Sequence, residues 1–435
     1  MPSNTWKAAL IAGSVLATLG RPALAQPIAP PVGTPLAGDG TPTALPGEPI
    51  AIGAAVPLGL VVPDSEVVYG PTLYGFDTAE VVAEAGGYLA GYSEQVGGEI
   101  LTGAAIVERV ANAYSVGPRV LLTLIEQRSG WLRAPSPAER TYPLGGAVPG
   151  LYNGLLEAAD ALNAGYYGRR FESRDTLLLK DGQTVRVGSE VNAGSFAVLS
   201  VLSSDVAAAD WPGLAAPSRF WTTWTMLFGD EPLYFNNTPV QADEMPPFPL
   251  RLPFADGSVW YFVQGPASPR GRGGPRAAVA FAPPPSGPAG CTPSAEWVVA
   301  AADGTVTHSD GMSVVIAGAV GGFAGVGWSV TYHHLAPQER VVAGTNVDAG
   351  EPIGHPSCDD GADSMTRVSL ARRFNGEWVP SDLPAAPLQL DGWAALPGEQ
   401  PGDGTLIRSD AAARQAVMQK VDAQNGIVAG LGGRP

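Results

Sequence analysis

The sequence has little charge, and most of the charge that it has is negative. Only 15% of the 435 residues are charged, and 25 lysines and arginines stand against 41 aspartates and glutamates, which gives a net charge of −16. Binding to a phosphate backbone requires clustered basic side chains, so this composition argues against a nucleic-acid partner. The 56 glycines and 42 prolines exclude a long all-helical protein or a coiled coil, because both residue types interrupt helices.

Cysteine is nearly absent, since the chain contains only Cys291 and Cys358. In an exported protein such a pair indicates one disulfide bridge, and a bridge that closes a loop of this length contributes about 4 kcal/mol to stability. Two thiolate metal ligands are the alternative, but neither cysteine has a partner at the C-x-x-C spacing. We therefore expect a Cys291–Cys358 bridge.

The start of the chain has the pattern of a secretory signal. Lys7 precedes the apolar run from Ala8 to Leu19, and Ala23-Leu24-Ala25 follows as a cleavage site for a signal peptidase. The run is too short to span a bilayer comfortably. The pattern predicts a signal peptide over residues 1–25, a secreted mature protein and no transmembrane segment after cleavage.

Composition and periodicity divide the remaining chain into four parts. Residues 26–65 are rich in Pro, Gly and Ala and predict a flexible leader, because they contain too few apolar side chains to offset their ordering entropy. Residues 66–245 predict a helical domain. Its helices are expected from Ile100 through Val110, from Pro118 to Gly130, from Leu151 to a close at Gly165, and from Asn192 to Leu202.

After residue 245 the apolar runs become short and rich in β-branched and aromatic residues. Runs at 259–263, 297–300, 313–316 and 328–332 are separated by Gly and Asp-Gly, which indicates strands joined by hairpins. Residues 246–400 thus predict a β-rich domain with an antiparallel sheet. Residues 401–435 predict a C-terminal helix and tail, with the helix running from Ser409 as N-cap to Asn425. The predicted fold class is α+β.

Several motifs of the β-rich domain resemble the lysostaphin-like (LytM-type) zinc metallopeptidases of bacterial cell walls. They are Trp-Val-Val-Ala-Ala-Ala-Asp-Gly-Thr-Val at 297–306, Tyr-His-His-Leu at 332–335, and a Gly-rich hairpin at 341–354. The resemblance implies a LytM-like fold and a cell-wall setting. In that family a His, an Asp four residues later and the second His of a His-x-His strand hold zinc, which lowers the pKa of its bound water.

The same resemblance indicates that most of these ligands are lost. It places Arg276 at the first His position, Ala280 at the Asp position, and Arg367 and Ser369 at the two positions of the His-x-His strand. Arginine stays protonated and has no lone pair to offer, and alanine has no donor. Only His334, which matches the catalytic histidine of the family's Tyr-x-His-Leu motif, remains. The domain is therefore predicted to be degenerate, with no metal and no cofactor.

An alternative zinc site would need other side chains to converge. The candidates are His308, His334 and His355 together with Asp303, Asp359 or Asp360. Their spacing does not suggest convergence, and the simpler interpretation makes His308 an exposed hairpin residue and His355 part of a turn beside the disulfide. Zinc is expected only under this alternative.

The helical domain resembles, more faintly, the lysozyme-like fold of lytic transglycosylases. The similarity lies in residues 118–131, where the family has its acidic residue directly before Ser129 and this chain has Arg128. Glu126 is two residues earlier, and two residues turn a helix by about 200°. Glu126 is therefore expected to face away from a groove on the Ser129 side of the helix. A general acid must lie beside the glycan and have a raised pKa, so Glu126 is only the alternative candidate for this role.

These observations favour an exported wall protein whose LytM-like domain is inactive and binds peptidoglycan or a wall hydrolase. The alternative is an active peptidoglycan hydrolase, either a zinc endopeptidase with unusual ligands or a muramidase that uses Glu126. A structural envelope protein without affinity for the wall is a third possibility.

Overall fold

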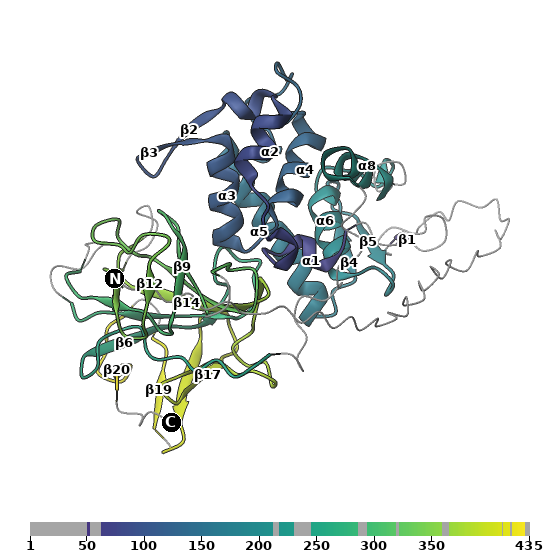
Figure 1. Cartoon of the computed structure of the whole chain (residues 1–435). Helices are drawn as coiled ribbons and strands as arrows, with labels where there is room; N and C mark the ends of the chain where they lie inside the picture. The colour runs from purple at the N-terminus through teal and green to yellow at the C-terminus, as the bar shows by residue number, and fades with distance from the viewer. Residues whose placement is uncertain are drawn as a thin grey trace, which may run out of the picture. The chain divides into compact units, whose positions relative to one another are not determined.

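The computed structural model describes residues 50–52, 62–211, 217–229, 245–285, 294–318, 322–358, 365–410, 412–417 and 420–430. Within these ranges a mostly helical part is followed by a part built mainly of antiparallel strands, as Figure 1 shows by its change from purple and teal to green and yellow. The fold class is therefore mixed α+β, as predicted. The signal peptide and most of the leader lie outside the described residues.

The helices of the first part follow the predicted order. Their bounds are α1 Asp64–Val67, α2 Thr78–Ala85, α3 Gly103–Tyr114, α4 Pro118–Ser129, α5 Leu151–Phe171, α6 Ala193–Ser203 and α8 Pro217–Phe228, with short 3-10 turns η1 Pro71–Leu73 and η2 Tyr88–Gly91. Helix α4 has Pro118 in its first turn and ends at Gly130, which adopts a left-handed conformation with φ 69°. None of the helices in the described ranges has the length and apolarity of a membrane-spanning segment.

Two predicted helix boundaries are wrong. Ile100 lies in strand β3 (Glu99–Thr102) and is 79% exposed, so helix α3 begins three residues later. Helix α5 runs through Gly165 instead of ending there. A Cβ at residue 165 would lie 2.7 Å from the Cα of Ala197 on α6. Gly165 therefore allows two helices to approach closely and has no role as a cap.

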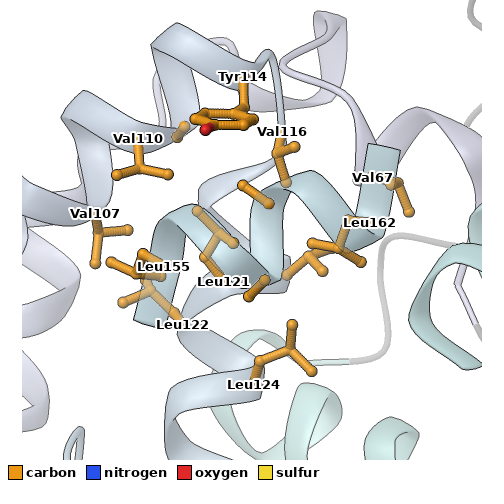
Figure 2. Packing of buried hydrophobic residues seen from close by; sticks show 14 of the residues in the cluster. Val67, Val107, Val110, Tyr114, Val116, Leu121, Leu122, Leu124, Leu155 and Leu162 are labelled. Atoms are coloured by element: carbon orange, nitrogen blue, oxygen red, sulfur yellow. The ribbon is translucent and has the colours of Figure 1, made fainter. Parts of the chain in front are cut away.

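The helical core forms where α3, α4 and α5 meet. Val107, Val110, Leu121 and Leu155 are fully buried there, and Figure 2 shows them converging from different helices. Burial of one such side chain stabilises the fold by roughly 1.5–3 kcal/mol. The core extends to Ala278, Ala371 and Trp378 of the second part, so the helices and the sheet share buried surface.

The leader ends earlier than predicted. Val62 is fully buried and Asp64 is 6% exposed, and the Asp64 carboxylate accepts hydrogen bonds from the Gly194 amide (2.7 Å) and the Asn192 side chain (2.6 Å). Strand β1 (Ile50–Ile52) pairs in parallel with β5 (Thr184–Val187), which also pairs with β4 (Thr176–Leu178). These contacts join segments that are far apart in the sequence, so the local composition of Pro, Gly and Ala could not predict them.

The second part is built around a large antiparallel sheet. Its strand order is β12-β9-β10-β11-β14-β7-β6-β20, and β15 also pairs with β14. The strands are β6 Val259–Ala267, β7 Ala278–Ala282, β9 Gly304–Ser309, β10 Val314–Ala317, β11 Trp328–His333, β12 Asn346–Val347, β14 Val368–Phe374, β15 Glu377–Trp378 and β20 Gly426–Val428. Strands β8 (Val298–Val299) and β13 (Pro352–Gly354) pair separately. The four runs predicted as strands overlap with β6, β8, β10 and β11.

The two faces of this sheet have different partners. Val330, Tyr332, Leu370 and Phe281 belong to the apolar core of the β-rich part. Side chains alternate along a strand, so the residues adjacent to these in each strand point to the opposite face of the sheet. On that face Ala371 and Ala278 pack into the helical core.

The predicted C-terminal helix is wrong. Residues 401–435 contain strand β18 (Gly404–Arg408), which pairs with β17 (Trp393–Pro397) and β19 (Ala413–Gln415), while β17 also pairs with β16 (Gln389–Leu390). Ser409 lies in a turn after β18, and Gly426 opens β20, which pairs with β6. Burial of Ile427 against the sheet outweighs the weak helical pattern of the preceding residues.

Candidate functional site

Two positions that the family resemblance assigns to metal ligands lie directly opposite each other. Ala280 on β7 pairs with Ser369 on β14, and Ser369 pairs on its other side with His333 on β11. Gln264 on β6 continues this row beyond Ala280. Residues paired across antiparallel strands point to the same face with Cβ atoms about 5 Å apart. The sheet therefore places these two predicted positions next to each other.

The surroundings of Ala280 are apolar and closed. Ala280 has no exposed surface and Ser369 has 4%. Val263 and Ala282 are buried beside Ala280, and Met365 and Val421 pack against them. Because Ala280 contributes only a methyl group to this cluster, the position offers neither a donor atom nor room for a hydrated ion.

His334 lies at the end of β11 in a backbone conformation that is rare for residues other than glycine, with φ 65°. Its carbonyl oxygen accepts a hydrogen bond from the Ser357 amide (2.8 Å), and the Arg367 amide donates to the Ser357 carbonyl (3.0 Å). His334 is 8% exposed and Arg367 also 8%. The bridge residue Ser357 thus connects the surviving histidine with the first position of the His-x-His strand.

Arg276, the third predicted metal position, points elsewhere. Its guanidinium donates to the carbonyl oxygens of Gly398 (2.5 Å) and Glu399 (2.9 Å). It also lines a cavity of about 620 Å³ between the end of α5 and two loops of the β-rich part. The structure therefore brings Ala280 and Ser369 together and separates the Arg276 head group from them.

The donor set at these positions does not fit zinc. A guanidinium and a methyl group cannot ligate the ion, and the family's imidazole is replaced at Ser369 by a hydroxyl, which is outside the usual Cys, His and carboxylate set. In the described part of the chain, no group of three His, Cys, Asp or Glu side chains is arranged to hold a metal ion. Asp359 and Asp360, which the alternative zinc site invoked, lie outside the described residues, and so does Cys291. The Cys291–Cys358 bridge stays a prediction, with Cys358 9% exposed.

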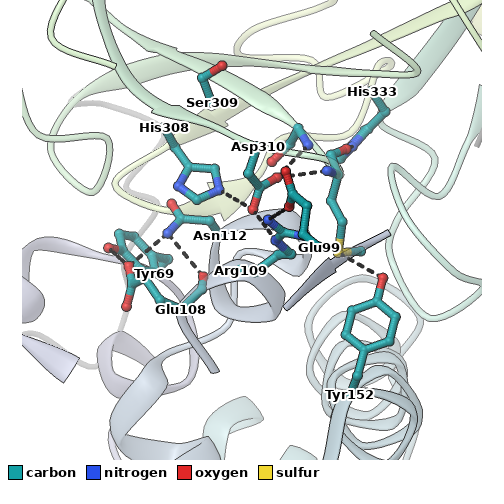
Figure 3. Close-up of polar contacts among 12 residues, drawn as sticks. Tyr69, Glu99, Glu108, Arg109, Asn112, Tyr152, His308, Ser309, Asp310 and His333 are labelled. Carbon is teal, nitrogen blue, oxygen red and sulfur yellow. Dashed lines mark hydrogen bonds and ion pairs between the residues drawn. The ribbon is translucent and has the colours of Figure 1, made fainter. Parts of the chain in front are cut away.

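A polar cluster joins helix α3 to the turn after β9, and no sequence pattern predicted it. It consists of Glu99, Arg109, His308 and Asp310. Arg109 contacts Glu99 (2.6 Å) and Asp310 (2.9 Å), and His308 Nε2 lies 3.0 Å from the Asp310 carboxylate. Figure 3 shows Asp310 between the histidine and the arginine. His308 has only 17% of its side chain exposed, so its prediction as an exposed hairpin residue is wrong.

The charges of this cluster act on Asp310. Burial alone would raise the pKa of its carboxyl group. The hydrogen bond and charge of His308 and the charge of Arg109 outweigh that effect and lower the pKa to about 2. Asp310 also accepts hydrogen bonds from the amides of Met312 (2.7 Å) and Ser313 (3.1 Å). It is therefore ionised at neutral pH and fixes the β9–β10 turn against α3.

A second contact between helices and sheet depends on Arg373, which is fully buried. Its guanidinium donates to Thr331 Oγ1 (2.6 and 2.9 Å) and to Ser115 Oγ (2.9 Å) of the helical part. Burial lowers the pKa of this arginine to about 10. Because Ser369, Ala371 and Arg373 alternate on β14, this contact lies on the same sheet face as Ala280 and Ser369.

Glu126 lies in the last turn of α4. Its carboxylate accepts hydrogen bonds from the amides of Leu132 (3.1 Å) and Arg133 (3.2 Å). These bonds tie down the turn that follows the helix. Aromatic residues of this domain also have structural roles. Tyr166 and Trp224 are fully buried, and the Tyr167 hydroxyl accepts a hydrogen bond from the Trp378 amide (2.8 Å).

Comparison with known proteins finds similarity to a protease family. Residues 60–241 match the family model described as LasA, N-terminal domain. Protease LasA of Pseudomonas aeruginosa (strain UCBPP-PA14) is 28% identical over 295 residues, which cover 63% of this chain and 66% of the relative. Protease LasA of a second strain of this organism is 27% identical over the same shares. The chain thus spans 66% of the length of these curated relatives.

Solved structures give weaker matches. The M23 metalloprotease pseudoalterin has 21% identity, covering 41% of this chain and all of that chain with a TM-score of 0.34. The catalytic domain of lysostaphin from Staphylococcus simulans has 20% identity, covering 28% and 88% with a TM-score of 0.21. The sequence matches by themselves confirm the resemblance to a LytM-type peptidase domain. The fainter lysozyme-like resemblance stays a prediction.

Proposed function

We propose that this chain is an exported, wall-associated relative of the LytM-type peptidases that binds peptidoglycan or a wall hydrolase without cleaving the wall. The pairing of Ala280 with Ser369 carries this proposal. Both residues stand where the family pattern has metal ligands, and neither supplies a ligand. The closed apolar packing of Ala280 with Val263 and Ala282 argues further against a reacting centre at this place, because a catalytic metal needs an open coordination position.

The retained fold supports binding as the remaining activity. The strands that carry the family motifs are present, and the backbones of His334 and Arg367 both hydrogen-bond to Ser357. One end of the sheet face is covered by the helical part through Ala371 and Arg373. A partner would therefore contact the edges and loops of the domain more readily than the row through Ala280.

The test combines binding and hydrolysis on one substrate. The mature full-length chain is mixed with purified sacculi, which are pelleted, and the turbidity of the suspension is followed in parallel. We expect the chain to pellet with the sacculi while turbidity stays constant. Failure to pellet, together with failure to bind purified wall hydrolases, would contradict the proposal and favour a structural envelope protein.

Loss of turbidity would identify which hydrolase is at work. Clearing that a chelator abolishes would assign a zinc endopeptidase and overturn the proposal. Clearing that persists with chelator and disappears in Glu126→Gln would assign a muramidase. Glu80→Gln is the matched control, because Glu80 is an exposed carboxylate on α2 and its loss should leave any muramidase activity unchanged.

A further inference from the structure

The cavity beside Arg276 has the size and lining of a small-ligand site. Its volume of about 620 Å³ lies within the range of roughly 300–1,000 Å³ that is typical of ligand pockets. Its walls come from the end of α5, the loop 272–276 and the loop 380–384. Of the positions that the family pattern assigns to metal ligands, only Arg276 lines this cavity, and Ala280 and Ser369 are not part of its wall.

Basic side chains predominate in the cavity although the whole chain is strongly acidic. Arg174, Arg272 and Arg276 line it, against the two carboxylates of Glu172 and Asp382. Arg174 is paired with Glu172 at 3.0 Å, and Arg276 is held by two backbone carbonyl groups. Arg272 is exposed, and within the described ranges its guanidinium forms no ion pair with an acidic side chain. The cavity therefore carries positive charge that an anion can neutralise.

The loop that presents Arg272 is held firmly against α5. Asp160 of that helix accepts hydrogen bonds from the amides of Arg272 and Gly273, both at 2.7 Å. A Cβ at Gly273 would lie 2.0 Å from the Asp160 carbonyl oxygen, so only glycine permits this approach. A loop fixed in this way loses little conformational entropy when a ligand binds.

The rest of the lining is apolar and rigid. Pro275, Pro380 and Pro384 form part of the wall, together with Phe171, which is 40% exposed. The Phe171 ring is stacked on Tyr167 with an interplanar angle of 9°. A bare inorganic anion would leave this surface without a partner, whereas an anion with an apolar body would cover it.

From these features we infer that the cavity binds the carboxylate end of a short peptide with small apolar side chains. A guanidinium group matches a carboxylate with two parallel hydrogen bonds, and the proline and phenylalanine surfaces accommodate the adjoining methyl groups. This inference deepens the proposed function and rests on it for the natural source of the ligand, since the peptides of peptidoglycan end in carboxylates.

The test uses N-acetyl-alanyl-alanine and its C-terminal amide, titrated into the full chain by isothermal calorimetry. We expect the acid to bind at least tenfold more tightly than the amide, because the amide loses the charge-assisted hydrogen bonds to the guanidinium group. Arg272→Gln should weaken binding of the acid at least tenfold. Arg186→Gln removes the same charge from an arginine that is 63% exposed and paired with Asp175, and it should leave binding unchanged.

Three results of these titrations would overturn the inference. The first is equal binding of the acid and the amide. The second is an Arg272→Gln chain that binds the acid as tightly as the unchanged protein does. The third is inorganic phosphate that binds as tightly as the dipeptide and displaces it. The last result would assign a phosphate site. Sacculus pelleting that persists when the dipeptide does not bind would refute this cavity as the contact and leave the proposed function standing.

Discussion

Ala280→Asp restores the carboxyl group that the family pattern has at this position, and we expect it to destabilise the fold. Ala280 has no exposed surface and is packed with Val263, Ala282 and Met365. A buried carboxylate without a cation costs about 3–5 kcal/mol, and the added volume costs about 1–3 kcal/mol more. The loss should therefore reach at least about 3 kcal/mol in the free energy of unfolding at neutral pH.

This loss should depend on pH in a defined direction. Burial raises the pKa of the introduced carboxyl group above the value of about 3.9 that it has in the unfolded chain. Because the unfolded chain ionises first, the destabilisation grows as the pH rises above about 4. Urea unfolding followed by tryptophan fluorescence at pH about 4.5 and about 7.5 measures this change.

Ala280→Asn is the matched control, because it adds nearly the same volume without an ionisable group. Its cost should be the same at both pH values. An Ala280→Asp chain as stable as the unchanged protein at pH about 7.5 would refute the reasoning, since it would show that the position is open to water.

Two further substitutions test the contacts that hold the molecule together. Asp310→Asn should cost about 2 kcal/mol at neutral pH, because the pKa of Asp310 is lowered from 3.8 to about 2. This contribution is present above pH about 4 and is lost as the pH falls toward about 2, so urea unfolding at pH about 7 and about 2.5 should show the two chains converging in acid. Gly117→Ala should cost about 3 kcal/mol by overpacking, since its Cβ would lie 2.0 Å from the Glu66 carbonyl oxygen. Thermal unfolding should show no comparable loss for Gly91→Ala, where nothing lies within 4 Å.

The sequence predicted those elements whose signals are local. Helix α4 follows from Pro118 and Gly130, which set its ends, and from apolar side chains at helical spacing. The strand that contains Ser369 follows from the order of the family motifs. The fully buried Arg373 and the pairing of Ile427 with Trp260 depend on contacts between distant segments, and no local pattern marks them.

The candidate site was predicted in part for the same reason. The family motifs identified Ala280 and Ser369, and the strand register brings them together. The link between Arg109 and Asp310, like the cavity beside Arg272, requires two domains to pack against each other. The spacing of apolar residues within one helix or strand carries no information about how two domains pack against each other.

The zinc content of the purified full-length chain tests the central claim most directly. The protein is incubated with excess zinc, desalted and analysed by inductively coupled plasma mass spectrometry, with the chain treated with a chelator as reference. The account predicts far less than one tightly bound zinc ion per chain, because Arg276, Ala280 and Ser369 cannot replace the family's ligands. One zinc ion per chain, lost when His334 is replaced by alanine, would contradict it.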